Sequence, residues 1–347
     1  MAHTGRPWTD HKPPAAAPVW AAIEGFGRYH VLCTALELDI FDTLGELGPS
    51  PAHRVAERLS LSATHLRTLL DCVVALGLLD QRHDIYELND TARRYLISNG
   101  PACMTELVGV APGPLENWSQ LADTVRNGHP ARPIEDDPAA FYVPLVEGTF
   151  TTMWRCATRA DSKIRYSSTP AARILDLGAG GAPWAIAALT ACPSGSAVIN
   201  DLEQVLEVAK RKTAEFAVDE RCEWRPGSYF EIEIEPATYD LVVLGHVCRA
   251  EGAIGAARLI ERSHDALRPG GRVIVADYFC DPQHKLNPHA VLMGATMMAS
   301  TLNGFTFTSD EFAGWLRSAG FVDLRLIEPI GFQQFIVASK PFSPNSQ

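Results

Sequence analysis

Residues 173–208 read RILDLGAGGAPWAIAALTACPSGSAVINDLEQVLEV, and this stretch decides the predicted fold. A short apolar strand runs into the glycine turn 178–181, a helix is predicted over 184–191, and a second apolar strand ends at Asp201. Strand, glycine turn, helix and strand form one βαβ unit, and ligands bind such units beyond the carboxyl ends of the strands. The stretch therefore predicts an α/β domain with a ligand site above its first strand.

The glycine turn contains Gly178, Gly180 and Gly181, which let the backbone turn sharply and let a ligand approach where a Cβ would collide. Asp201 follows roughly 20 residues later, where an acid commonly accepts hydrogen bonds from the two hydroxyls of a ribose. A dinucleotide fingerprint would need another glycine at position 183, which is Pro183. The pattern favours S-adenosylmethionine over NAD(P), although such turns also occur in sheets that bind nothing there.

The alternation of strands and helices continues to the end of the chain. Strands are predicted at 222–225, 239–244, 273–277, 324–327 and 335–338, and helices at 205–216, 253–267 and 309–319. This rhythm predicts a doubly wound, Rossmann-like sheet with its ligand at the carboxyl ends of the strands. The predicted cofactor site comprises Asp176, Gly178, Gly180, Gly181, Asp201, Leu202, Gly227, Ser228, Tyr229 and Gly245.

The segment before this domain is predicted to form a winged helix. Residues 20–44 are apolar around most of a helix circumference, so we expect that helix to be covered on several sides, in part by a partner subunit. Helices at 51–59 and 64–76 and a hairpin at 79–88 complete the unit. The sequence Thr-His-Leu-Arg at 64–67 carries one fixed positive charge, which favours a dimerisation module over a DNA-binding one.

Composition limits the classes of partner. The chain has 347 residues, which is long enough for two domains, and 46% of them are hydrophobic, which supports large cores. Its formal net charge of −11 disfavours nucleic acid and anionic membranes as partners. No apolar run reaches the ~20 residues that a membrane span requires. The 8 cysteines show no CxxC spacing, which indicates free thiols in the reducing cytoplasm.

The domain boundaries follow from these patterns. We expect a flexible leader at 1–18, a winged-helix dimerisation domain at 19–100, a helical linker and substrate-pocket segment at 101–168, an S-adenosylmethionine-binding domain at 169–341 and a tail at 342–347. The pocket segment contains Phe150, Met153 and Trp154, which could line a pocket for a flat substrate. Aromatic residues at helical spacing also commonly belong to a core, so both interpretations stay open.

The motifs resemble those of the plant-type and actinobacterial O-methyltransferases, which are class I S-adenosylmethionine-dependent enzymes with an N-terminal dimerisation domain. The resemblance rests on LDLGAGGAPWAIA (175–187), INDLEQVLEVA (199–209), RPGSYF (225–230), LRPGGRVIVAD (267–277) and NGFTFTSDEFAGWLRSAGF (303–321), in this order after the winged helix. It implies a homodimer that methylates hydroxyl groups of small aromatic or secondary metabolites. It also implies a cofactor cradle at the glycine turn, a ribose contact at Asp201 and adenine contacts at Ser228 and Tyr229.

Several positions depart from the family pattern. Ala182 stands where the family usually has a glycine, and the adenine-side acid of the family falls on Ser228. The general-base histidine of the family falls on Arg249, and its two acidic helpers fall on Asp277 and Thr306. Because arginine stays protonated, it cannot remove a proton from a phenol at neutral pH.

Three hypotheses for the chemistry remain. His246, three residues before Arg249, could act as the base; Arg249 could instead hold a carboxylate or enolate substrate, with positioning supplying much of the rate. In the third hypothesis, methyl transfer is lost or redirected to a hydroxylation, decarboxylation or cyclisation. Carbon or nitrogen methylation and a ligand-sensing regulator are further alternatives. Arg249 could also simply form a surface ion pair with Glu251.

The remaining predicted site residues concern the acceptor and a metal. Some relatives that methylate the carbon of 2-oxo acids hold a metal with two histidines, at the position of His246 and near Met297. Here the second position has no histidine, and His289 comes too early, so no metal is predicted; we expect His284 and His289 at the pocket mouth or in solvent. The predicted catalytic residues are His246, Arg249 and Asp277, and the predicted acceptor-binding residues are Phe150, Met153, Trp154, Met293, Met297 and Asn303.

Overall fold

The computed structural model describes residues 16–110, 113, 115–169 and 171–342. The chain divides into two compact units, Met1–Thr105 and Glu106–Gln347. The predicted leader falls mostly on residues 1–15 and the predicted tail mostly on 343–347, which lie outside the described residues. Within the described part, no helix is long and apolar enough to cross a membrane.

The first unit has the predicted order of helix, helix and hairpin. Its elements are α1 (Ala17–Glu37), α2 (Ile40–Leu47), β1 (Ser50–Pro51), α3 (Ala52–Leu59), α4 (Ala63–Ala75), β2 (Leu79–Arg82), β3 (Ile85–Leu88) and α5 (Asp90–Tyr95). The strands form one antiparallel sheet in the order β1-β3-β2. Its core includes Phe41, Leu70 and Tyr86, each at most 1% exposed.

The single helix predicted over 20–44 is two helices, so that prediction was wrong. The chain turns at Asp39, which has a left-handed φ of 53°, and α2 begins at the next residue. Apolar residues at helical spacing continue through the turn, which is why the sequence pattern does not reveal it. Along α1, Trp20, Ile23 and Phe26 are 60%, 60% and 75% exposed, so this chain leaves an apolar helix face uncovered.

The second unit contains the predicted doubly wound sheet, seven strands in the order β6-β5-β4-β7-β8-β10-β9. The strands are β4 (Arg173–Leu177), β5 (Ser196–Asp201), β6 (Cys222–Pro226), β7 (Tyr239–Gly245), β8 (Leu267–Asp277), β9 (Val322–Ile330) and β10 (Gln333–Ser339). Strands β4 to β8 pair in parallel. Strand β10 is antiparallel to both its neighbours, so its first residues lie at the carboxyl end of β8, where Gln334 pairs with Asp277.

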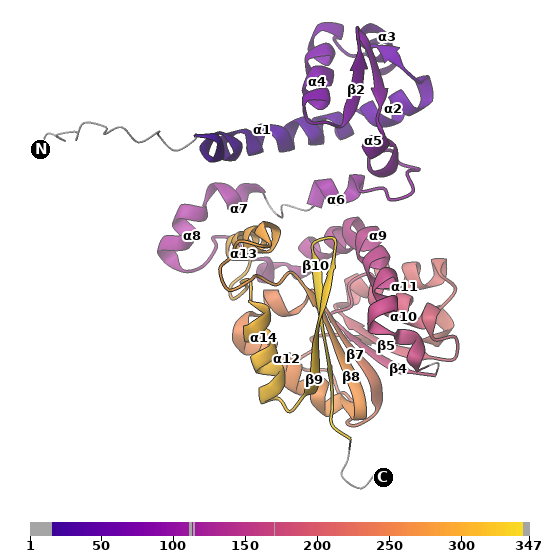
Figure 1. The fold of residues 1–347 in the computed structure, drawn as a ribbon, viewed down its shortest axis with the longest axis vertical. Helices are drawn as coiled ribbons and strands as arrows, with labels where there is room; N and C mark the ends of the chain where they lie inside the picture. The colour runs from indigo at the N-terminus through magenta and orange to yellow at the C-terminus, as the bar shows by residue number, and fades with distance from the viewer. Residues whose placement is uncertain (1–15, 111–112, 114, 170, 343–347) are drawn as a thin grey trace, which may run out of the picture. The chain divides into compact units, whose positions relative to one another are not determined.

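Helices cover both faces of this sheet (Figure 1). One face packs against α9 (Pro138–Ile164), α10 (Pro183–Ala191) and α11 (Glu203–Glu215), and the other against α12 (Gly252–Ala266) and α14 (Ser309–Ser318). Alternate residues of β4 enter the two cores, with Ile174 on the α10 side and Leu175 on the α12 side. Burying each such side chain contributes about 1.5–3 kcal/mol, so the central strands are held from both sides.

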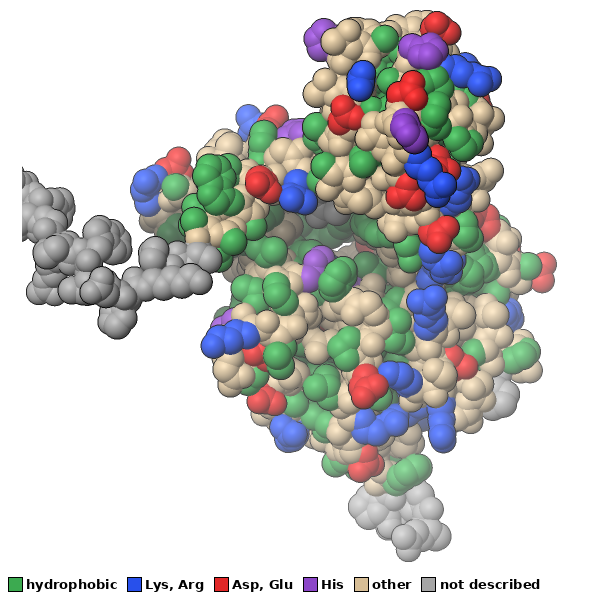
Figure 2. All heavy atoms as spheres, turned by 45° about the horizontal axis from the view of Figure 1, so that its top comes forward, with side chains coloured by type: hydrophobic (Ala, Val, Ile, Leu, Met, Phe, Trp, Pro, Cys, Tyr) green, Lys and Arg blue, Asp and Glu red, His purple; other side chains and the backbone are tan. Residues whose placement is uncertain are grey.

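Further helices lie beyond the carboxyl ends of the strands (Figure 1). They are α6 (Thr105–Val110), α7 (Leu115–Ser119), α8 (Leu121–Asn127) and α13 (Pro288–Ser300), and α13 packs against α7 and α8. On the face of Glu106–Gln347 that Figure 2 shows, Lys and Arg side chains are interspersed with Asp and Glu side chains. That face therefore lacks the continuous basic surface that phosphate binding needs.

Candidate active site

The glycine turn after β4 has room only for glycine. Gly178 and Gly180 have φ values of +63° and +59°, in the left-handed region. A Cβ on Gly178 would lie 2.8 Å from Cγ2 of Val247, and one on Gly181 would lie 3.0 Å from Cδ2 of Phe150. Ala182, in the position where the family usually has glycine, also has a left-handed φ of 58°, a conformation that costs a non-glycine residue about 1–2 kcal/mol.

The carboxylate of Asp201 closes this turn from the end of β5. Its two oxygens accept hydrogen bonds from the backbone N–H groups of Gly180 and Leu202, each at 2.7 Å. Burial raises the pKa of Asp201 to about 6, although the two N–H donors act in the opposite direction. An ionised carboxylate has further lone pairs for hydroxyl donors, so Asp201 suits the ribose of a nucleoside.

The predicted adenine side follows β6. The Gly227 N–H donates to the Asp201 carbonyl at 3.0 Å, and the Asn200 amide donates to the Gly227 carbonyl at 2.8 Å. Ser228 Oγ accepts a hydrogen bond from the Phe230 N–H at 3.2 Å. These bonds bring the loop after β6 beside the glycine turn, as a nucleoside site at the strand ends requires.

Tyr229 lies between the adenine side and the reaction side. Its ring is 3.4 Å from the position of a Cβ on Gly178, and its hydroxyl donates to the Glu251 carboxylate. Burial raises the pKa of Tyr229 above its ordinary value, and the Glu251 charge adds to the increase. The tyrosine hydroxyl therefore stays protonated and donates.

Asp176 of β4 lies beneath the start of α10. It is fully buried, and its Oδ2 accepts a hydrogen bond from the Ala185 N–H at 3.1 Å. Burial raises the pKa of Asp176 to about 8, so the neutral acid predominates at neutral pH. This placement connects Asp176 to the helix that follows the turn, and its predicted cofactor contact stays a prediction.

Asp176→Asn is expected to make stability less dependent on pH. Because the folded-state pKa is raised, the stabilisation from this group is full below about pH 4 and is lost as pH rises through about 8. Relative to the variant, the wild type should lose on the order of 3 kcal/mol of unfolding free energy between pH 5 and pH 8. Thermal melts at both pH values measure this, and parallel pH dependence of the two proteins would contradict it.

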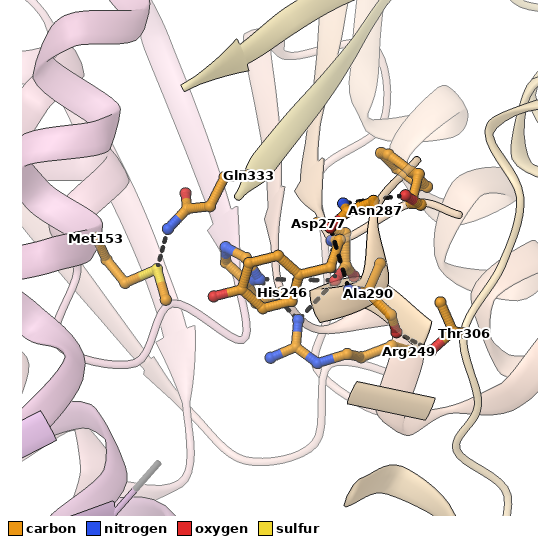
Figure 3. Close-up of polar contacts among 10 residues, drawn as sticks. Met153, His246, Arg249, Asp277, Asn287, Ala290, Thr306 and Gln333 are labelled. Carbon is orange, nitrogen blue, oxygen red and sulfur yellow. Dashed lines mark hydrogen bonds and ion pairs between the residues drawn. The ribbon is translucent and has the colours of Figure 1, made fainter. Parts of the chain in front are cut away.

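A cluster of three polar side chains lies at the carboxyl ends of β7 and β8. Arg249 Nη1 is 2.6 Å from Asp277 Oδ1 and 2.7 Å from His246 Nδ1 (Figure 3). The side chains of His246, Arg249 and Asp277 are 10%, 15% and 2% exposed. All three predicted catalytic residues are therefore brought together in one buried cluster.

The charges in this cluster are fixed by their mutual contacts. Burial alone would lower the pKa of Arg249, but the Asp277 carboxylate and Tyr278 outweigh it and the pKa is raised. Burial alone would raise the pKa of Asp277, but Arg249 and His246 hold it well below its usual range. The pair is a buried cation and anion at neutral pH.

The contact with Arg249 also sets the tautomer of His246. A guanidinium only donates, so His246 Nδ1 must accept, and the proton of the neutral imidazole lies on Nε2. Burial lowers the pKa of His246; Asp277 opposes this change and the Arg249 cation adds to it. Nδ1 is 3.6 Å from Asp277 Oδ1, beyond hydrogen-bond distance. His246 therefore presents a donor, and its lone pair is held by a permanent cation.

The interpretation of Arg249 as a surface residue paired with Glu251 is wrong. Arg249 is buried and pairs with Asp277, whereas the Glu251 carboxylate accepts from Tyr229. Thr306, at the second acidic position of the family, donates its hydroxyl to the Ala290 carbonyl at 2.9 Å (Figure 3). It joins α13 to the following loop and supplies no charge.

Aromatic rings surround the cluster. Tyr278 has its ring centroid 4.9 Å from that of His246 and 4.7 Å from that of His289, and the Arg249 guanidinium lies 5.2 Å from it. His289 stacks on the exposed Phe332 at 4.5 Å. His289 is thus half-buried against the site, while His284 is exposed. Across the described residues, no group of three or more His, Cys, Asp or Glu could hold a metal ion.

The predicted acceptor-binding residues fall in different places. Phe150 and Trp154 pack against Phe216, the residue after α11, with ring centroids 6.0 Å and 4.9 Å apart, as part of the core. Met153 points the other way, and its sulfur contacts the Gln333 amide (Figure 3). On and after α13, Met297 is buried, Met293 is half-buried, and Asn303 is exposed beside Gly252.

The sequence-based predictions missed several residues of the site. Trp184 is buried and fills the space over Gly245, where a Cβ would lie 2.5 Å from the indole. Burial is the main cause that raises the pKa of Tyr142 in α9; the charge of Glu251 raises it further, and the charge of Arg249 lowers it. Gln333 and Tyr278 adjoin the cluster from β10 and the end of β8. Only Tyr278, directly after the predicted strand at 273–277, had a signal in the sequence.

Known proteins of one family are similar to this chain. The family model for the O-methyltransferase domain matches residues 150–322, and the model for the O-methyltransferase dimerisation domain matches residues 20–98. The 3-hydroxy-5-methyl-1-naphthoate 3-O-methyltransferase of Streptomyces sahachiroi is 26% identical over 318 residues, which cover 87% of this chain and 88% of that protein. The acetylserotonin O-methyltransferase of Mus musculus is 28% identical over 339 residues, which cover 91% and 86%.

A solved structure extends the likeness to the whole fold. Human N-acetylserotonin methyltransferase, crystallised in complex with SAM, has a TM-score of 0.80 at 24% identity, with 96% of this chain and 100% of that chain covered. The glycine turn, the Asp201 carboxylate and the strand order described above fit that cofactor. The chain belongs to the S-adenosylmethionine-dependent O-methyltransferase family, with a dimerisation domain ahead of its methyltransferase domain.

Proposed function

We propose that this methyltransferase acts on an oxygen of a small acceptor that reaches the site already as an anion. The observation that carries the proposal is the Arg249 contact with His246 Nδ1 at 2.7 Å, because it occupies the lone pair that a histidine base would need. The Asp277 carboxylate is held as an ion by Arg249 and has a pKa well below its usual range, so it is a poor base as well.

The cofactor would be held by the chain as follows. Asp201 would accept the ribose hydroxyls, the glycine turn would let the amino-acid portion pass, and Gly227, Ser228 and Tyr229 would flank the adenine. When bound, S-adenosylmethionine supplies an electrophilic methyl group on a sulfonium. Leu202 and Gly245 would limit the crevice, because Leu202 directly precedes α11 and Gly245 leaves space for Trp184.

The acceptor would be held by donors. Arg249 donates hydrogen bonds from Nη1 to His246 and Asp277. Its Nη2 and Nε make no hydrogen bond to another residue of the described part. These groups and the His246 Nε2–H would face an oxyanion, and fixed donors in a buried site stabilise such charge strongly. The two relatives compared above are named for aromatic hydroxyl compounds, so we propose an aromatic acceptor with an acidic hydroxyl.

The pH dependence of turnover tests this mechanism. S-adenosylhomocysteine release should be followed with two aromatic acceptors whose hydroxyl pKa values differ by about two units. Without a protein base, the rise of kcat/KM with pH should shift by about the same amount between the acceptors. A shared midpoint for both would show that a group on the protein removes the proton. No release with any acceptor would favour the alternative of a non-methylating reaction.

The remaining proposals concern the assembly of the protein, its pocket segment and its location. We propose a homodimer in which a partner covers the exposed apolar face of α1 at Trp20, Ile23 and Phe26.

We also propose that residues 101–168 serve as a separate pocket segment, since Met153 and Tyr142 of α9 adjoin the cluster. The free cysteines among the described residues support a cytoplasmic location.

A further inference from the structure

A half-buried carboxylate at the candidate active site has one oxygen free. Glu251 directly precedes α12, and its Oε1 accepts a hydrogen bond from the Tyr229 hydroxyl. Oε2 accepts no hydrogen bond from a described residue, and no described Lys, Arg or His pairs with the carboxylate. Oε2 is also not among the polar side-chain atoms that are closed to solvent, so a ligand can reach it.

The carboxylate does not serve to cap its own helix. Glu251 occupies the N-cap position of α12, but its side chain accepts no capping hydrogen bond. Gly255, one turn later, makes room for this side chain, because a Cβ on Gly255 would lie 2.6 Å from Cβ and 3.3 Å from Oε2 of Glu251. Burial raises the pKa of Glu251, and the bond from Tyr229 offsets only part of that increase. Such a carboxylate gains from a further hydrogen-bond donor.

The ring of Tyr229 fixes where this carboxylate lies. The ring is 3.4 Å from the position of a Cβ on Gly178, and its centroid is 4.9 Å from that of Phe230, with the two rings 74° apart. Phe230 also lies 3.5 Å from the position of a Cβ on Gly255. Tyr229 is thus held by contacts at the glycine turn and beside α12, and its hydroxyl holds Oε1 of Glu251.

The sheet order places this contact beside the nucleoside crevice. Tyr229 follows β6 and Glu251 follows β7, and β5 and β4 lie between those two strands in the sheet. The intervening strands end at Asp201 and at the glycine turn 178–181. Glu251 therefore bonds the loop after β6, which carries the predicted adenine contacts, at the edge of the sheet where the nucleoside is expected.

We propose that Glu251 selects the base of the cofactor, with its Oε2 accepting a hydrogen bond from the exocyclic amino group of adenine. That amino group donates hydrogen bonds, and a carboxylate oxygen only accepts them, so the two are complementary. The assignment rests on the proposed placement of adenine beside Ser228 and Tyr229. It gives the second oxygen of Glu251 the donor that the described residues do not supply.

Matched ligands test the assignment without turnover. The probes are S-adenosylhomocysteine and its 6-deamino analogue, in which hydrogen replaces the amino group of adenine, and calorimetry measures the affinity of each. We expect the wild type to bind S-adenosylhomocysteine at least about tenfold more tightly, since a hydrogen bond to a charged group is lost with the analogue. Equal affinities for the two ligands would overturn the proposal.

Two variants locate the preference. Tyr229→Phe keeps the carboxylate and should keep the preference. Adding Glu251→Leu removes both partners of the existing hydrogen bond and leaves no unpaired hydroxyl, and the preference should then fall below about twofold. The double variant should bind the 6-deamino analogue as tightly as Tyr229→Phe does, which shows that its cofactor site is folded. A preference that survives in the double variant would overturn the assignment.

Controls separate the contact from other causes. Glu135→Gln removes a neighbouring exposed carboxylate, which accepts from the Leu302 N–H at 3.0 Å, and it should keep the preference. Loss of the preference in Ser228→Ala would assign the amino group to that hydroxyl and contradict the proposal. A changed ratio of the affinities for S-adenosylmethionine and S-adenosylhomocysteine in the double variant, with the amino-group preference unchanged, would assign Glu251 to the sulfonium instead and also overturn it.

A blocking variant distinguishes failure of the adenine placement from failure of the Glu251 assignment. Ser228→Trp fills the space in which adenine is proposed to lie, so it should abolish binding of S-adenosylhomocysteine. Unchanged binding in this variant would mean that the proposed placement of the cofactor is wrong. Lost binding, together with a preference that is insensitive to Glu251, would mean that only the role of Glu251 is wrong.

Discussion

Replacing Arg249 by methionine is expected to lower kcat/KM for methyl transfer by about 100- to 1000-fold, the effect typical of removing a buried oxyanion donor. Methionine fills a similar volume but donates no hydrogen bond, so the acceptor anion loses its cation. It also leaves the Asp277 carboxylate, 1% exposed, without its ion-pair partner. Steady-state kinetics with an aromatic hydroxy acid, together with a thermal melt, measure both consequences.

A double variant separates catalysis from folding. Losing one partner of a buried ion pair costs about 3–5 kcal/mol of stability, whereas removing both charges is often close to neutral. Arg249→Met combined with Asp277→Asn should therefore recover most of the stability lost in the single variant and none of the activity. If the single variant keeps kcat/KM within about threefold of the wild type, Arg249 does not take part in acceptor binding or in the reaction.

Asp201→Ala is expected to weaken S-adenosylmethionine binding by about 100-fold, since two charge-assisted hydrogen bonds to the ribose would be lost. It would also leave the Gly180 N–H without the hydrogen bond that it donates to the Asp201 carboxylate at 2.7 Å. Calorimetry with S-adenosylhomocysteine measures the affinity without turnover. Glu203→Gln is the matched control, because it removes an exposed carboxylate two residues away, and it should change the affinity by less than about twofold.

Cofactor affinity and protein stability should depend on pH in opposite directions. Burial raises the pKa of Asp201 to about 6, so cofactor affinity should fall as pH drops below about 6. Stability should move the other way, because a group with a raised folded-state pKa stabilises most below its unfolded pKa and loses that contribution as pH rises through about 6. Affinity that stays constant from pH 7 to pH 5 would contradict a ribose contact through the ionised carboxylate.

The sheet of the second unit was predictable because its signals are local. Each central strand is a short apolar run bounded by glycine or proline, and the glycine turn and Asp201 follow β4 and β5 directly in the sequence. The break at Asp39 was not predictable, since apolar residues at helical spacing continue on both sides of it. There, a left-handed residue ends one helix and the packing of Ile40 and Phe41 starts the next.

The candidate site could be predicted only for residues that directly follow a recognisable strand or motif in the sequence. His246 and Asp277 could be named because β7 and β8 end beside them, and Arg249 could be named from the resemblance to the family. The alternative that Arg249 pairs with Glu251 was wrong, because Glu251 is near Arg249 in sequence but accepts a hydrogen bond from Tyr229. Gln333 was missed because its position depends on where the last strand enters the sheet. Long-range pairing of that kind leaves no periodic pattern in a single sequence.

Strand β10 lies between β8 and β9 in the sheet, although it is the last strand along the described part of the chain. Because synthesis starts at the N-terminus, β4 to β7 and the nucleoside crevice can form early. The edge of β8 stays unpaired until β10 has been made. Gln333 reaches that edge only with the final hairpin. Gln333, which adjoins the cluster of His246, Arg249 and Asp277, is thus placed after the nucleoside-facing residues of the earlier strands.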